Sequence, residues 1–280
     1  MPKPIAVFFA GCNGAGKSTL RDEILKSNQP FIDADLIAKQ VNFSHLPNKD
    51  IAAGREAVRR FRYYLQEKQS FSIETTLSGV SALNNMRKVK NAGFEVHLYY
   101  CGLASVELNI ARVAMRVAKG GHNIPETTIR RRYDESLQNL KTALEIADEY
   151  YVFDNSSTKN THQICISHTA NNTYITDIPK WLEPHLPKTV RAKQLFNDKL
   201  ATLSDTDRQN VLIYEKDLKT ILANGDLTQD QQDMVMANFY NNAADKIQNG
   251  KSLLPKAVGL ENITLTSDNR EQGDEPEMDR

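Results

Sequence analysis

Residues 5–18 read IAVFFAGCNGAGKS, and this stretch decides the fold. The run IAVFFA is short, continuous and apolar, with β-branched and aromatic residues, so it predicts a buried strand. The segment Gly11–Ser18 that follows matches the pattern G-x-x-x-x-G-K-[ST] in full, and a helix is expected to begin near Lys17. A strand, a glycine-rich turn and a helix in this order predict a phosphate-binding loop.

The residue types of this loop suit the β- and γ-phosphates of ATP. Glycines let the backbone approach phosphate oxygens with its N–H groups, and the helix adds the positive end of its dipole. Lys17 is expected to reach the phosphates, and the hydroxyl of Ser18 is expected to bind Mg²⁺. We therefore expect ATP and Mg²⁺ as ligands, with the nucleotide bound by Gly11, Cys12, Asn13, Gly14, Ala15, Gly16, Lys17, Ser18 and Thr19.

A glycine-rich turn that matches the pattern by chance is the alternative to a phosphate loop. The strand pattern before the glycines and the helix pattern after them favour the phosphate loop, because the motif needs that context. Cys12 inside the loop is interpreted as a small filler residue, and nothing in the sequence supports a role in oxidation.

The amino-acid composition narrows the classes of protein to which the chain can belong. The chain has 280 residues, 40% of them hydrophobic and 25% charged, which is typical of a globular protein. Its formal net charge is zero, so we do not expect it to bind nucleic acid or an anionic membrane through its overall charge. The three cysteines are widely spaced and form no CxxC, which argues against a zinc site or a disulfide framework. We see no targeting or membrane-spanning segment, and a cytoplasmic location is expected.

Helix and strand patterns alternate after the loop. The expected helices are 50–68, 81–92, 104–118 and 124–147, and the further expected strands are 31–33, 70–76, 94–102, 150–156 and 162–169. This alternation predicts an α/β fold of the P-loop type, a three-layer sandwich around a mostly parallel sheet.

The pattern changes near Pro187, after which helical stretches occur without a convincing strand. We expect a kinase-like P-loop domain over 1–187, a helical extension over 188–258, and an acidic, disordered tail over 259–280. The extension is interpreted as an accessory helical cap. An antitoxin-like module acting in cis, a dimerisation element and a docking region are the alternatives.

Acidic residues follow two of the expected strands. Asp33 and Asp35 stand at the end of the expected strand 31–33, and Glu74 lies near the end of 70–76. Ligands of open α/β sheets bind at the carboxyl ends of the strands, so Asp35 and Glu74 are candidates for binding a phosphate acceptor. For Asp33 a turn or cap role is equally expected, and Thr76 either binds the acceptor or caps the next helix.

Arg112 and Arg116 are four residues apart, so on a helix they share one face. The pair Gly120-Gly121 follows and is a sensible hinge for a closing lid. Arginines brought in by such a lid stabilise the charge of a transferring phosphoryl group. The alternative is a solvated basic helix face, which we would prefer in a chain without the phosphate loop.

The ordered set of motifs resembles the zeta toxin family of P-loop kinases over roughly residues 3–185. The motifs are GCNGAGKST in the loop, FIDAD, SIETTLSG, the stretch RVAMRVAKGGHNIPETTIRRRY, and DNS at 154–156. The resemblance implies an adenylate-kinase-like fold. It also implies ATP-dependent phosphorylation of a hydroxyl of UDP-N-acetylglucosamine, the activity of a phosphotransferase with an alcohol group as acceptor.

The resemblance also assigns roles to single residues. It implies that Asp35 is the catalytic base, that Glu74 holds the acceptor with Thr76 beside it, and that Lys17 is the loop lysine. It places the lid arginines at or near Arg112 and Arg116. An antitoxin protein is a possible partner, whereas nucleic acid and membrane are not expected partners.

Two alternatives to sugar-nucleotide phosphorylation remain open. Gly120-Gly121-His122 stands where better-known family members have a differently composed lid, so the acceptor could be a nucleoside, a sugar or a polynucleotide end. The chain could also be a non-catalytic, ATP-dependent interaction module. Asp35 and Glu74 argue against that module, because a pure switch needs no acceptor base.

Overall fold

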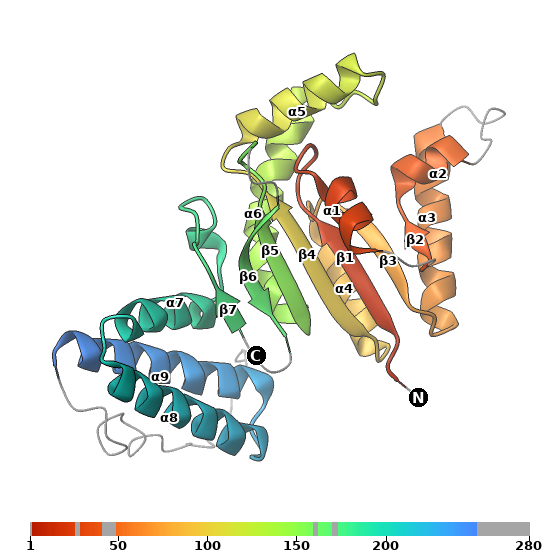
Figure 1. The fold of residues 1–280 in the computed structure, drawn as a ribbon. Helices are drawn as coiled ribbons and strands as arrows, with labels where there is room; N and C mark the ends of the chain where they lie inside the picture. Colours follow the sequence, from red (N-terminus) through yellow and green to blue (C-terminus); the bar gives the residue numbers. More distant parts are fainter. Residues whose placement is uncertain (1, 26–28, 41–48, 159–161, 170–172, 251–280) are drawn as a thin grey trace, which may run out of the picture. The chain divides into compact units, whose positions relative to one another are not determined.

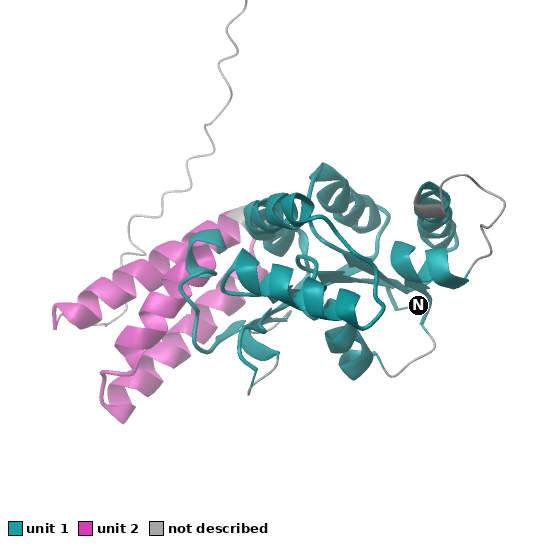
Figure 2. Cartoon of the chain, turned by 90° about the horizontal axis from the view of Figure 1, so that it is seen from above, with its two compact units in different colours: residues 1–187 teal, residues 188–280 magenta. Residues whose placement is uncertain are grey.

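The computed structural model of the chain describes residues 2–25, 29–40, 49–158, 162–169 and 173–250. The chain divides into two compact units between Pro187 and Lys188, which Figure 2 colours separately. The acidic tail predicted over 259–280, and with it residues 251–258, lies outside the described residues.

The first unit is an α/β unit and the second is helical. The first contains β1 (Ile5–Ala10), α1 (Lys17–Ile24), β2 (Phe31–Ile32), α2 (Ala34–Gln40), α3 (Lys49–Gln66), β3 (Phe71–Thr75), α4 (Val80–Asn91), β4 (Glu95–Gly102), α5 (Val106–Ala118), α6 (Glu126–Ile146), β5 (Glu149–Asp154), β6 (Gln163–His168), β7 (Thr173–Ile175) and the short 3-10 helix η1 (Glu183–His185). The second contains α7 (Lys188–Leu200), α8 (Asp205–Ala223) and α9 (Gln229–Gln248).

The strands form one sheet in the order β2-β3-β1-β4-β5-β6-β7 (Figure 1). Neighbouring strands from β2 to β5 are parallel, whereas β6 and β7 run antiparallel to their neighbours. The predicted mostly parallel P-loop fold is therefore confirmed. Strand β6 reverses direction because residues 155–162, which precede it, are too few for the helical crossover that a parallel strand needs.

Helices cover both faces of this sheet. Two consecutive residues of β4 contact helices on opposite faces of the sheet. Tyr100 shares a hydrogen bond with Ser136 of α6, while Cys101 packs in a cluster with Leu20 of α1. In Figure 1, α4 and α6 lie behind the sheet and α1 lies in front. Because β1 is parallel to its neighbours β3 and β4, their carboxyl ends meet at one edge, where the loops can build a site.

Three described elements were missing from the prediction, the helix α2, the strand β7 and the short 3-10 helix η1. The sequence pattern placed Asp33 and Asp35 at the end of an expected strand and predicted no helix there, but α2 begins at Ala34, one residue after the short strand β2. The side chain of Asp33 accepts hydrogen bonds from the backbone N–H groups of Asp35 and Leu36, so it caps the helix. The cap role considered for Asp33 is therefore the one in the structure.

The second unit packs three helices around its own apolar core. Phe196, Leu218 and Phe239 are among the buried members of this core. Thr228 caps α9 through a capping box with Gln231. No helix among the described residues of the chain is both long and apolar enough to cross a membrane.

Candidate active site

The loop between β1 and α1 has the backbone shape of a phosphate cradle. Gly11, Gly14 and Gly16 have φ angles of 133°, 79° and 103°, a region that side chains disfavour. A Cβ atom added at Gly11 would lie 2.0 Å from the carbonyl oxygen of Cys101, and one at Gly14 would lie 2.6 Å from that of Asn109. The glycines of the motif are therefore needed both for conformation and for close packing against the backbone.

The loop's carbonyl oxygens are held from outside, which leaves N–H groups for a ligand. Lys17 Nζ donates to the carbonyl of Cys12 at 3.1 Å, and Asn109 Nδ2 donates to that of Asn13 at 2.7 Å. Among the described residues, the N–H groups of Gly14 and Gly16 have no hydrogen-bond partner. Unpaired N–H groups beside a helix N-terminus are what an anion needs.

Glu74 closes the loop on the side of β3. Its carboxylate lies 3.6 Å from Lys17 Nζ and accepts a hydrogen bond of 3.0 Å from the hydroxyl of Ser18. A third group, the Arg21 guanidinium, lies 3.8 Å from the carboxylate and stacks on the ring of Phe31 at 4.4 Å. The structure thus brings Glu74 to the loop lysine and serine, two of the groups that the motif assigns to phosphate and metal.

The donor set formed by Ser18 and Glu74 fits Mg²⁺. Magnesium prefers hard oxygen ligands, and it is usually bound through one or two carboxylates together with waters and phosphate oxygens. A hydroxyl and a carboxylate oxygen 3.0 Å apart at the phosphate loop supply such ligands. The sequence predicted only Ser18 for the metal, because Glu74 is distant in sequence and only the β1–β3 pairing brings it to the loop.

Asp35 lies in the first turn of α2, at the edge of the sheet where Glu74 also lies, one residue before the end of β3. Its side chain is exposed and makes no hydrogen bond or ion pair with the described residues. The capping residue Asp33 stands two positions before Asp35, and its carboxyl pKa is raised by burial and then by the neighbouring charge of Glu74. The carboxylates of Asp33 and Glu74 therefore lie near enough to influence one another.

Thr76 follows Glu74 but lies apart from the contacts of the loop. Its hydroxyl shares a hydrogen bond of 2.7 Å with the hydroxyl of Ser78, and the side chain is half-buried. The neighbouring Thr75 hydroxyl accepts from the N–H of Leu77. The structure thus gives Thr76 a local partner in the turn before α4, and its predicted role with the acceptor stays a prediction.

Arg112 and Arg116 line one cavity on α5. The cavity has a volume of about 640 Å³ and is lined by Lys39, Arg112, Met115, Arg116, Lys119, Gly120 and Gly121. Arg112 donates to the carbonyl of Asn155 at 2.7 Å, and Arg116 donates to that of His122 at 2.9 Å. Because Lys39 comes from α2, the cavity joins the helix of Asp35 to the arginine helix, and its cationic lining suits an anionic ligand.

The predicted hinge at Gly120-Gly121 forms the end of α5. Gly120 has a φ angle of 85°, as a residue just past a helix end commonly has. A Cβ atom on Gly121 would lie 2.6 Å from Cγ of Arg116, so this glycine lets the chain fold back on the arginine side chain. The carbonyl of His122 accepts a hydrogen bond from Arg116.

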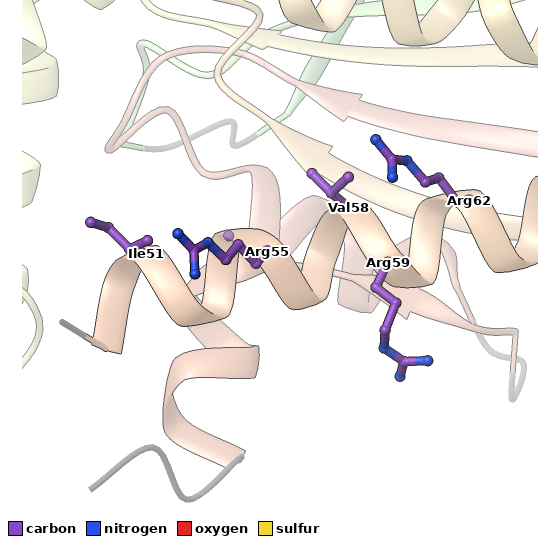
Figure 3. A pocket seen from close by; sticks show the side chains of 6 residues that line it. Ile51, Arg55, Val58, Arg59 and Arg62 are labelled. Atoms are coloured by element: carbon purple, nitrogen blue, oxygen red, sulfur yellow. The ribbon is translucent and has the colours of Figure 1, made fainter. Parts of the chain in front are cut away.

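A second cavity of about 600 Å³ runs along α3 (Figure 3). Ile51, Arg55, Val58 and Arg62 are spaced so that they form one stripe of this helix, and Ile51 and Val58 are half exposed. Arg59, which also borders the cavity, pairs with Glu56 of its own helix at 2.7 Å. The cavity thus combines apolar and basic side chains on α3, the helix that leads into β3.

Several residues that hold the loop were not predicted as site residues. Arg132 of α6 donates to Asn13 Oδ1 at 2.9 Å, and Asn155 donates to the carbonyl of Ala15 at 2.8 Å. His162 also contacts the loop, through the carbonyl of Gly16. Arg132 and Asn155 lie in motifs noted in the sequence, the RRR run and DNS. Nothing in the sequence marks His162.

The cysteines near the loop are buried. Cys12 Sγ contacts the carbonyl of Ile129 at 3.5 Å, and burial raises the pKa of its thiol. Cys101 Sγ donates to the carbonyl of Ala15 at 3.0 Å, and burial raises its pKa to about 12. Both thiols are therefore poor nucleophiles, consistent with a packing role for Cys12.

Known proteins resemble this chain in sequence and in structure. The family model described as Zeta toxin matches residues 1–166. An uncharacterized protein of Haemophilus influenzae (strain ATCC 51907 / DSM 11121 / KW20 / Rd) is 44% identical over 128 residues, which make up 46% of this chain and 91% of that protein.

Two solved structures share the fold of this chain. A chain in the crystal structure of AvrRxo1-ORF1 with AvrRxo1-ORF2 and sulphate ions gives a TM-score of 0.53 at 13% identity, covering 66% of this chain and 64% of that one. A chain in the native complex of the same two proteins gives 0.53 at 12% identity, covering 72% of each. This chain thus spans less than two thirds of the first of these, and at such identities the likeness shows the fold alone.

Proposed function

Because the chain belongs to the zeta toxin family, we propose that it is an ATP-dependent kinase that phosphorylates a hydroxyl group of a small molecule. The observation that carries this proposal is the meeting of Lys17, Ser18 and Glu74 at the phosphate loop. An exposed carboxylate, Asp35, lies on the adjoining helix at the same edge of the sheet. A phosphate cradle with an acceptor base at hand is what phosphoryl transfer requires.

The loop would bind and orient the nucleotide. The N–H groups of Gly14 and Gly16 would donate to phosphate oxygens, and Lys17 would exchange its bond to the Cys12 carbonyl for the γ-phosphate. Ser18 and Glu74 would hold Mg²⁺, which when bound supplies positive charge to the phosphate oxygens.

Side chains of α2 and α5 would act on the acceptor and on the transferring phosphoryl group. Asp35 would take the proton of the acceptor hydroxyl as the phosphoryl group arrives, since its carboxylate has no competing partner among the described residues. Arg112 and Arg116 line the cationic cavity that also reaches Lys39 of α2, and would stabilise charge on the transferring group. Glu74 would then have a second task, to orient the acceptor with Thr76, as the family resemblance implies.

For the acceptor we propose a sugar nucleotide such as UDP-N-acetylglucosamine. The support is family membership together with the basic cavities on α3 and α5, because a diphosphate-bearing acceptor needs cations. A nucleoside, a sugar or a polynucleotide end would meet the same catalytic groups. The zero net charge of the chain makes the polynucleotide end the weakest of these acceptors.

We also propose a protein partner of the antitoxin kind. Both solved structures reported above contain AvrRxo1-ORF1 together with AvrRxo1-ORF2, so a chain of this fold is found bound to a second protein. A partner that covers the phosphate loop would silence the proposed reaction without any change in the active-site residues.

The test is incubation of the purified chain with ATP, Mg²⁺ and a metabolite extract, followed by mass spectrometry. We expect one species to gain a single phosphate, and UDP-N-acetylglucosamine added alone to gain it as well. Phosphorylation of another metabolite would correct the acceptor and keep the kinase. ATP binding without transfer to anything would overturn the kinase and favour the interaction module. Lys17→Ala is the matched control, which should lose all transfer.

A further inference from the structure

Asn155 lies at a junction behind the phosphate loop, directly after β5. Its side chain donates to the carbonyl of Ala15 at 2.8 Å, and its backbone N–H donates to the carbonyl of Gly102 at 3.0 Å. Its carbonyl accepts from Arg112 at 2.7 Å, and its Oδ1 accepts from the N–H of His162 at 3.1 Å. All four polar groups of this buried residue are therefore used, and two of the bonds reach groups of the proposed reaction.

His162 completes the junction from the start of β6. Its Nε2 lies 3.3 Å from the carbonyl of Gly16, and its Nδ1 lies 3.2 Å from the carboxylate of Glu23 on α1. A carbonyl only accepts, so Nε2 is the donor toward Gly16. His162 also has a φ angle of 52°, which is uncommon for a residue other than glycine and persists where surrounding contacts determine it.

The two side chains occupy the space beside Gly16 that a side chain would otherwise fill. A Cβ atom added to Gly16 would lie 2.4 Å from Asn155 Nδ2 and 3.1 Å from His162 Nε2. The absence of a side chain at Gly16 therefore leaves room for these two donors on the outer side of the loop. The carbonyls of Ala15 and Gly16 point toward them, which leaves the loop's N–H groups to the opposite side.

We propose that Asn155 and His162 are positioning residues that clamp the phosphate loop in its anion-binding shape and hold Arg112 beside it. The proposal rests on the proposed function, because it concerns the phosphates of the same nucleotide. The clamp acts through the loop backbone: it fixes the peptide groups of residues 15 and 16, so that the N–H groups need no reorganisation when phosphate arrives. The carbonyl of Asn155 gives Arg112 a fixed distance from that loop.

The test compares the affinity of the full chain for ATP with Mg²⁺ against its affinity for adenosine, by competition with a fluorescent ATP analogue. His162→Leu removes the donor to Gly16 and should weaken ATP binding by about tenfold while changing adenosine binding by less than about twofold. His162→Gln keeps an amide donor and should bind ATP within about threefold of the unaltered chain.

His168→Leu is the matched control, because His168 ends β6, the strand that His162 directly precedes, and stacks on Tyr150 away from the loop. It should leave the ratio of the two affinities unchanged. Asn155→Asp, which keeps the volume and removes the donor to Ala15, is the second variant and should weaken ATP at least as much as His162→Leu. It keeps the proposal testable if His162→Leu does not fold.

Equal losses for ATP and adenosine would show a merely structural role and overturn the clamp, as would unchanged ATP binding in His162→Leu and Asn155→Asp. Either result would leave the proposed function standing. Failure of the unaltered chain to bind ATP would instead contradict the proposed function, and the clamp with it.

Discussion

Replacing Glu74 by glutamine should strengthen the binding of ATP without metal and weaken phosphoryl transfer. The carboxylate lies 3.6 Å from Lys17 Nζ, with the lysine 6% and the glutamate 17% exposed. At an effective dielectric constant of about 20, that separation corresponds to an attraction of about 4.6 kcal/mol. Phosphate must compete with this attraction for Lys17, and it must also approach the negative charge of Glu74.

Only part of this energy will appear in binding, because Lys17 also keeps the carbonyl of Cys12 as a partner. If roughly a third to a half of this attraction energy is gained by the bound phosphate, Glu74→Gln should bind metal-free ATP about 10- to 50-fold more tightly. The glutamine oxygen can still accept from Ser18, so the loop should keep its shape. Loss of the carboxylate that holds Mg²⁺ should lower turnover by at least about 100-fold.

The assay is a titration with ATP in the presence of a chelator and again with Mg²⁺. Asp22→Asn is the control, since Asp22 is 68% exposed and bonds Arg21 on the same helix without touching the loop lysine. It should change both affinities by less than about twofold. Weaker or unchanged binding of metal-free ATP by Glu74→Gln would refute the competition between carboxylate and phosphate.

Three further predictions concern other parts of the chain. Lys193→Met removes a buried ion pair of 2.7 Å with Glu215 and should lower the unfolding free energy of the helical unit by about 3 kcal/mol in urea titrations; a loss under about 0.5 kcal/mol would contradict this. Cys12 should react with iodoacetamide far more slowly in the native chain than in urea, because burial raises its pKa; equal rates would argue against burial. Asp33→Asn keeps a side chain that caps a helix well. It also removes the ionised carboxylate, which folding disfavours because the pKa of Asp33 is raised in the folded state. Its stabilisation, up to about 1 kcal/mol, should appear at neutral pH and vanish at pH values below the unfolded pKa, and the reverse order would refute the assignment.

The fold and the phosphate loop were predictable because their signals are local. The strand, glycine and helix signals of 5–24 follow one another along the chain, and the alternation of patterns gave the α/β class. Helix α2 was missed because its start depends on the Asp33 cap, and a short acidic segment after a strand also fits a loop. The reversal at β6 follows from the few residues between β5 and β6, which cannot hold the helical crossover that a parallel strand needs.

The candidate site was predictable where a motif names the residue and not where contacts come from distant segments. Lys17 and Ser18 are fixed by spacing alone. The meeting of Glu74 with both depends on the register between β1 and β3, which periodicity does not give. Asn155 and His162 contact the loop from the two ends of the connection between β5 and β6, and single polar residues outside helices and strands carry no periodic signal.

The proposed reaction depends on Asp35 of α2, which would take the proton of the acceptor hydroxyl that attacks the phosphate held by the loop. The direct measurement is transfer of labelled γ-phosphate from ATP to the identified acceptor by the unaltered chain and by Asp35→Asn, with ATP affinity measured beside it. We expect Asp35→Asn to bind ATP with an affinity within about threefold of that of the unaltered chain, and to transfer phosphate at a rate at least about 100-fold lower. Transfer by Asp35→Asn at the unaltered rate would contradict the account.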